Sequence, residues 1–108
     1  MGAIAVPIQQ GKLDVWEGFM SELNGPRKAE FDDMNQRFDV TGHRAWLQHT
    51  PDGHQMVIAV HDGPGADGFM GKLGSSEDGF DVWFRGMLQE VHGIDLSGPL
   101  PPPAEQRL

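Results

Sequence analysis

The chain has 108 residues, with 8 Lys and Arg against 16 Asp and Glu, a net charge of −8, and no Cys. This length suits one domain with its own core, and the lack of Cys excludes a disulfide framework and thiol chemistry. There is no basic patch and no long apolar run, so we expect neither nucleic acid nor a membrane as partner. The N-terminus lacks the features of a signal peptide, so we expect a cytoplasmic protein.

The first part of the chain predicts one strand followed by two helices. Residues 3–8 are apolar and β-branched, and Pro7 suits the end of a strand, where a missing N–H is tolerated. Residues 12–24 carry apolar side chains at the helical period. A Gly-Pro pair ends that helix and can open a second one over residues 26–38.

A β-hairpin is predicted over residues 43–61. Pro51 presets the first turn position, and the Asp52-Gly53 pair provides the left-handed residue of a three-residue turn. In this register His43 lies opposite His61. The alternative is a two-residue turn centred on Asp52-Gly53, which would shift the register by one residue and exchange the faces.

The preferred register sorts the hairpin side chains into two faces. We expect the bulkier face to lie under the helices, and its members are Arg44, Trp46, Gln48, Met56, Ile58 and Val60. We expect the flatter face to be left uncovered and to join two copies in a two-fold homodimer through Ala45, Leu47, Val57 and Ala59.

The second part of the chain predicts two helices, a strand and a tail. Residues 66–73 suggest a short helix, and residues 80–92 carry the most regular apolar stripe of the chain. Residues 94–97 alternate apolar and polar side chains and predict a fourth strand. Residues 99–108 are rich in Pro and must be extended, so we place the domain at residues 1–98 and a tail after it.

This order of elements predicts an α+β fold of the ferredoxin-like, split βαβ type. Right-handed crossovers would give a four-stranded antiparallel sheet with the helices on one face. The other face would then be bare and would need a partner.

Several short segments also resemble a known family. They are Val6-Pro7-Ile8, Gly11-Lys12, Glu22-Leu23-Asn24-Gly25, Trp46-Leu47-Gln48, Thr50-Pro51-Asp52-Gly53, Asp81-Val82-Trp83-Phe84-Arg85 and Val91-His92-Gly93-Ile94-Asp95-Leu96. The family comprises small bacterial proteins of uncharacterised function in the dimeric α+β barrel superfamily, which also holds cofactor-free monooxygenases of antibiotic biosynthesis and haem-degrading enzymes. The resemblance implies the fold, a dimer and a pocket between helices and sheet. No Asn-Trp-His set for haem degradation is found.

The candidate ligand-binding residues are chosen for that pocket. They are Arg44, Trp46, Gln48, Trp83 and His92. A buried polar side chain without a partner is costly, so Arg44 and Gln48 either line a wet pocket or lie in water at the sheet edge. His92 also suits the end of a helix, where a charged imidazole would favour the dipole.

Catalytic residues cannot be assigned from the sequence. His43 and His61 would be close enough to share a metal, but no third ligand accompanies them at a known spacing, so we expect no metal and no cofactor. Two functions remain. The first is a small-molecule-binding protein or cofactor-independent monooxygenase-like enzyme, and the second is a non-catalytic dimeric module with a regulatory or structural role.

Overall fold

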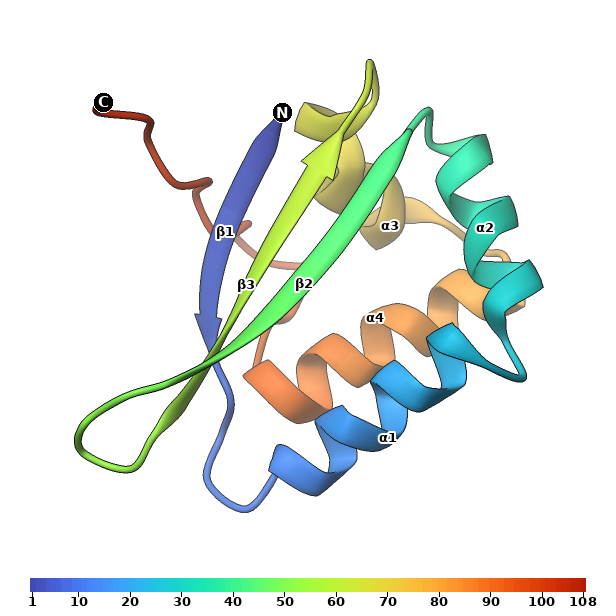
Figure 1. The fold of residues 1–108 in the computed structure, drawn as a ribbon. Helices are drawn as coiled ribbons and strands as arrows, with labels where there is room; N and C mark the ends of the chain where they lie inside the picture. The colour runs from blue at the N-terminus through green and yellow to red at the C-terminus, as the bar shows by residue number, and fades with distance from the viewer.

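A computed structural model describes all 108 residues and shows a three-stranded antiparallel sheet with helices packed on one of its faces (Figure 1). The elements are β1 (Gly2–Pro7), α1 (Leu13–Asn24), α2 (Lys28–Arg37), β2 (Gly42–His49), β3 (Gln55–Asp62), the 3₁₀ turn η1 (Ala66–Gly68), α3 (Phe69–Ser75) and α4 (Gly79–His92). The strand order is β1-β3-β2, which places β3 in the centre. The predicted α+β class is confirmed. No helix has the length and apolar character needed to cross a membrane.

The predicted hairpin register is confirmed. His43 pairs with His61, and the amide of Thr50 donates to the carbonyl of His54 at 2.9 Å to close the turn. Gly53 has a φ of 84°, the left-handed conformation that the turn requires and that glycine adopts without strain. The turn residues therefore determine which side chains share a face, as the sequence indicated.

The predicted four-stranded sheet is wrong, and so is the ferredoxin-like α+β barrel fold built on it. In place of a strand, residues 94–97 contain a turn in which Asp95 Oδ1 accepts hydrogen bonds from the amide and hydroxyl of Ser97. The prolines that follow carry no amide N–H to donate to a neighbouring strand. The tail runs beside β1 (Figure 1), and the amide of Ala104 donates to the carbonyl of Ala3 at 2.6 Å.

The predicted assignment of the two hairpin faces is also wrong. Val57 and His61 are 4% and 6% exposed and lie under the helices, whereas Trp46 is 48% exposed on the uncovered face. The helices present large aromatic side chains to the sheet, and these lie over the face that carries small residues such as Ala45 and Ala59. The size of the side chains on one sheet face does not by itself place that face inside, because the volume of the helix side chains also decides which face they can cover.

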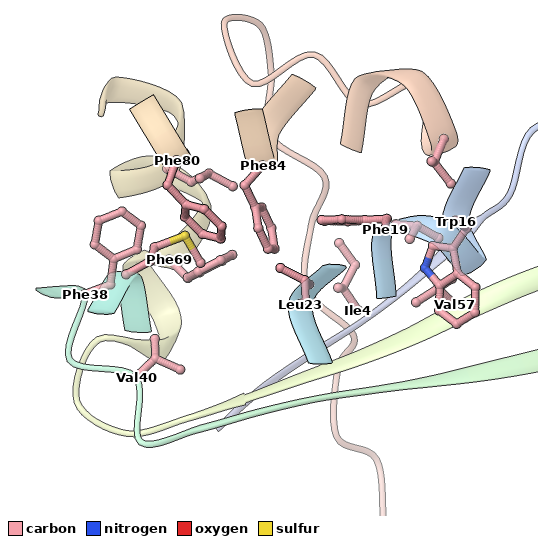
Figure 2. Close-up of a cluster of buried hydrophobic side chains, with 14 of the residues drawn as sticks. Ile4, Trp16, Phe19, Leu23, Phe38, Val40, Val57, Phe69, Phe80 and Phe84 are labelled. Atoms are coloured by element: carbon pink, nitrogen blue, oxygen red, sulfur yellow. The ribbon is translucent and has the colours of Figure 1, made fainter. Parts of the chain in front are cut away.

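The core lies between the sheet and the helices (Figure 2). Phe69 is 2% exposed, and Phe84 meets Phe19 edge to face with ring centroids 5.0 Å apart. Ile4 and Val57 contribute from the sheet side. Aromatic pairs of this geometry add to the free energy gained by burying their apolar surface.

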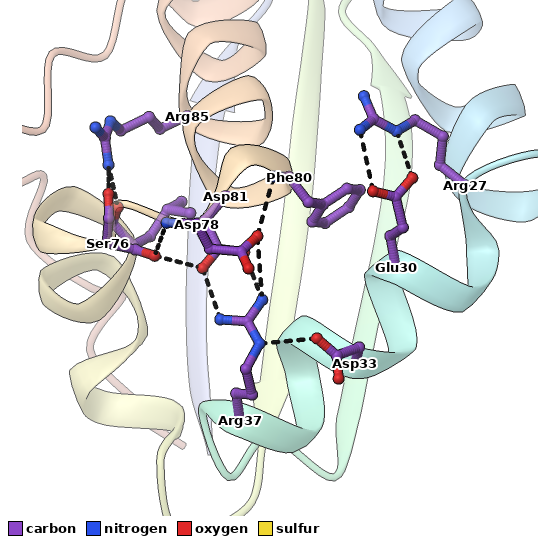
Figure 3. Close-up of polar contacts among 10 residues, drawn as sticks. Arg27, Glu30, Asp33, Arg37, Ser76, Asp78, Phe80, Asp81 and Arg85 are labelled. Carbon is purple, nitrogen blue, oxygen red and sulfur yellow. Dashed lines mark hydrogen bonds and ion pairs between the residues drawn. The ribbon is translucent and has the colours of Figure 1, made fainter.

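An ion pair joins α2 to α4. The guanidinium of Arg37 donates two hydrogen bonds of 2.8 Å to the carboxylate of Asp81, whose side chain is fully buried (Figure 3). Ser76 Oγ donates a third at 2.6 Å. Burial opposes ionisation of Asp81, but the bonds from Arg37 and Ser76 outweigh it and hold its pKa below the ordinary value. This pair fixes the position of α4, which bounds the cavity described below.

Candidate functional site

A cavity of about 410 Å³ lies between the sheet and the helices. Its wall is mostly apolar and includes Trp16, Phe19 and Val57 (Figure 2). Ala45 points to the helix side of edge strand β2 and is nevertheless exposed, and Asn24 at the end of α1 is exposed as well. Both line the cavity, so it opens to solvent between the edge of β2 and α1.

A hydrogen-bonded pair of imidazoles forms part of the wall. His43 Nε2 lies 3.2 Å from His61 Nε2, and His43 Nδ1 lies 2.9 Å from Asn35 Oδ1. The two histidines face each other across β2 and β3, and Phe69 stacks on His61 with ring centroids 4.4 Å apart. The strands therefore position both rings, while α2 and α3 supply their neighbours.

Both imidazoles are neutral in this environment. Burial, with a smaller contribution from the neighbouring His61, lowers the pKa of His43 to about 3. Burial also lowers the pKa of His61, partly offset by Asp62. Near neutral pH the pair therefore offers hydrogen bonding without charge.

His92 lies at the end of α4 and is a third imidazole in the cavity wall. Its Nδ1–H donates to the carbonyl of Pro7 at 2.8 Å. Burial lowers the pKa of His92, while the hydrogen bond to Pro7 opposes the shift. The ring is therefore neutral and does not supply the positive charge that was expected at this end of the helix. Gly93, with a φ of 72°, provides the helix cap instead.

Two predicted residues, Arg44 and Trp46, reach only the rim of the cavity. Both belong to β2 and line the cavity at its open edge, but their side chains are exposed because they lie on the uncovered face. Arg44 donates to Asp62 at 2.9 Å, and its guanidinium lies 5.6 Å from the centre of the Trp46 ring. The positive charge of Arg44 therefore lies outside the cavity.

The other two predicted residues lie outside the cavity. Gln48 is exposed and donates to the backbone carbonyl of His49 at 2.9 Å. Trp83 packs between helices, with the guanidinium of Arg27 4.1 Å above its ring and Phe19 at its edge. Both side chains are thus held by contacts outside the cavity.

The sequence interpretation missed His43 and His61 as members of the ligand site. The hairpin register correctly placed them opposite each other, but the reversed faces directed attention away from them. No group of three or more His, Cys, Asp or Glu side chains is arranged to hold a metal ion. The contacts that the three imidazoles make are the hydrogen bonds and ring contacts described above.

Comparison of the chain with models of protein families, with curated proteins and with solved structures finds no match. The family resemblance noted from the sequence therefore stays a prediction. The cavity and the side chains that line it are the features of the protein that bear on its function.

Proposed function

We propose that the protein binds a small, largely apolar organic molecule in the cavity between the sheet and the helices. The observation that carries this proposal is the cavity itself, about 410 Å³ in volume, mostly apolar and open at the β2 edge. Volumes of roughly 300–1,000 Å³ with a few polar groups among apolar walls are typical of small-molecule sites. Here the polar groups of the interior include His43, His61 and His92.

The protonation behaviour of these histidines favours binding over cofactor-independent oxygenation. A general base works best when its pKa lies near the working pH. The pKa values of His43, His61 and His92 are all lowered by burial, so each imidazole is a weak base that stays neutral. Such a ring accepts a hydrogen bond readily but abstracts a proton poorly.

The cavity also argues against a purely structural module. An unfilled apolar space sacrifices packing and destabilises a fold, so a protein without a ligand gains from closing it. The large aromatic side chains around the space, such as Phe31 and Phe84, instead leave it open beside the small Ala45 and Ala59. A bound molecule would restore those contacts.

A cavity-filling variant tests the proposal. Ala59 lines the cavity and Ala5 lies on the uncovered face of the neighbouring strand, so Ala59→Leu and Ala5→Leu form a matched pair. Backbone amide shifts in NMR spectra would be followed during titration with a panel of apolar ring compounds. We expect saturable shifts around Ala45 in the wild type and in Ala5→Leu, and at least tenfold weaker binding in Ala59→Leu.

Thermal melts of Ala59→Leu and Ala5→Leu are the control and establish that both variants fold. Binding that is equal in Ala59→Leu and wild type, or the absence of saturable shifts with every compound, would contradict the proposal.

A further inference from the structure

The hydrogen bonds around the cavity determine which nitrogen of each imidazole carries its proton. The carbonyl oxygen of Asn35 can only accept, so His43 Nδ1 carries a proton and donates to it. His43 is neutral, and its Nε2 therefore holds a lone pair. That lone pair accepts from His61 Nε2–H at 3.2 Å, which leaves His61 Nδ1 without a proton.

The hydrogen bond of His92 likewise determines which of its nitrogens carries the proton. Its Nδ1–H donates to the carbonyl of Pro7, so Nε2 is the unprotonated nitrogen. Neither His92 Nε2 nor His61 Nδ1 has a partner within the protein, yet no buried side-chain nitrogen or oxygen is left unpaired. Both atoms must therefore reach accessible space. His92 borders the cavity, and His61 borders both it and a smaller hollow beneath residues 100–103.

The interior of the cavity offers one donor, the indole N–H of Trp16, which is neutral and has no partner within the protein. Asn24 uses its amide N–H to bond the carbonyl of Met20, and Arg44 is directed to Asp62 in solvent. No Asp, Glu or Lys side chain lines the cavity. Its interior thus presents imidazole acceptors, a single neutral donor and no cation, which disfavours a carboxylate or any other anion that would lose its hydration there.

We infer that the ligand is a neutral apolar molecule carrying an O–H or N–H donor, such as a hydroxylated ring, and that His92 Nε2 in the cavity wall accepts its hydrogen bond. This inference rests on the proposed function and adds the ligand class. A charged carboxylate of the same size would find no cation and only the Trp16 N–H as a donor inside, and a plain hydrocarbon would leave the lone pair of His92 Nε2 unpaired.

Three probes of one shape test the ligand class. Naphthalene, 1-naphthol and 1-naphthoate would be titrated into the wild-type protein at pH 7.5, with amide shifts as the readout. We expect 1-naphthol to bind about tenfold more tightly than naphthalene, the effect of roughly one net hydrogen bond, and 1-naphthoate to bind more weakly than naphthalene.

The outcomes distinguish a failure of the ligand class from a failure of the proposed function. Equal affinities for naphthalene and 1-naphthol, or tightest binding of 1-naphthoate, would overturn the inference while leaving the proposed function in place. If none of the three binds, both fail.

Variants then test which atoms accept. In His92→Asn the amide can still donate to the carbonyl of Pro7, while the Nε2 lone pair is lost. We expect the preference for 1-naphthol to shrink severalfold with the affinity for naphthalene unchanged. His54→Asn, in the exposed hairpin turn, is the matched control and should keep the full preference. If His92→Asn folds and keeps the full preference, the acceptor assignment is wrong; the wild-type probe series tests the ligand class even if the variant fails to fold.

Discussion

His43 and His61 share a hydrogen bond between their Nε2 atoms, 3.2 Å apart, in the interior of the protein. That bond requires at least one of the two rings to be neutral, since two imidazolium ions would each present only donors. Burial already disfavours the charged forms. The pair therefore links the stability of the fold to pH.

We expect the protein to lose stability as the pH falls below about 6.5. The pKa of His43 is about 3 in the folded protein and near 6.5 when unfolded, so between these values the unfolded chain binds more protons. The stabilisation is fully present above pH 6.5 and declines by about 1.4 kcal/mol per pH unit for this one group. His43→Gln should flatten the slope of the unfolding free energy from denaturant melts between pH 6 and 4.5, and exposed His49→Gln should not. An unchanged slope in His43→Gln would show that another group dominates.

The ion pair between Arg37 and Asp81 should be far more sensitive to mutation than its exposed neighbour. Asp81→Asn leaves the guanidinium without its buried partner and should cost about 3–5 kcal/mol of unfolding free energy. Asp33→Asn, which removes an exposed bond to the same arginine, should cost less than about 1 kcal/mol. Chemical denaturation at pH 7 measures both. Because the pKa of Asp81 is lowered, its contribution is present above about pH 4 and disappears in stronger acid, where wild type and Asp81→Asn should converge.

Trp16, which is buried, should contribute much more to the free energy of unfolding than Trp46, which is exposed. Trp16 is 6% exposed in the core, and Trp16→Ala should cost about 3–5 kcal/mol. Trp46 is 48% exposed on the uncovered face, and Trp46→Ala should cost about 1–2 kcal/mol because much of its surface already meets water. Equal losses in denaturant melts at low protein concentration would show that Trp46 is buried in solution.

The uncovered sheet face should join two copies of the chain. Its apolar members include Trp46 and the directly opposite Ile58, and a two-fold contact lets such a patch complement itself. This is the face opposite to the one predicted from the sequence. Ile58→Lys should yield monomers in light scattering at micromolar concentration, and Val82→Lys, on the exposed side of α4, should remain dimeric. A monomeric wild type would refute the dimer.

The tail should be dispensable for folding. Residues 99–108 form no helix or strand, and one backbone hydrogen bond, from Ala104 to Ala3, joins them to the edge of β1. Deletion of residues 101–108 should leave a single cooperative thermal transition, lowered by a few degrees at most. A broad, non-cooperative melt would place the tail in the core and move the domain boundary.

The features that the sequence determined are local ones. Turn chemistry at Pro51 and Gly53 specified the hairpin and its register, and the apolar period over residues 80–92 specified α4. Each depends on conformational preferences of neighbouring residues, which are visible without the rest of the chain. His92, at the end of that helix, was also named as a candidate from the sequence, and its side chain lies in the wall of the cavity.

The tertiary structure alone decided which face of the sheet is covered. Strand alternation creates two faces, but their burial depends on the volumes that distant helices bring, here the aromatic rings of Phe69 and Phe84 above small residues on the sheet. The same distant packing places His43 and His61 inside and keeps them neutral. The missing fourth strand has a different cause, because the turn at Asp95 satisfies locally the groups that a strand would have paired with β1. Register could be read from nearby residues, whereas burial required the whole fold.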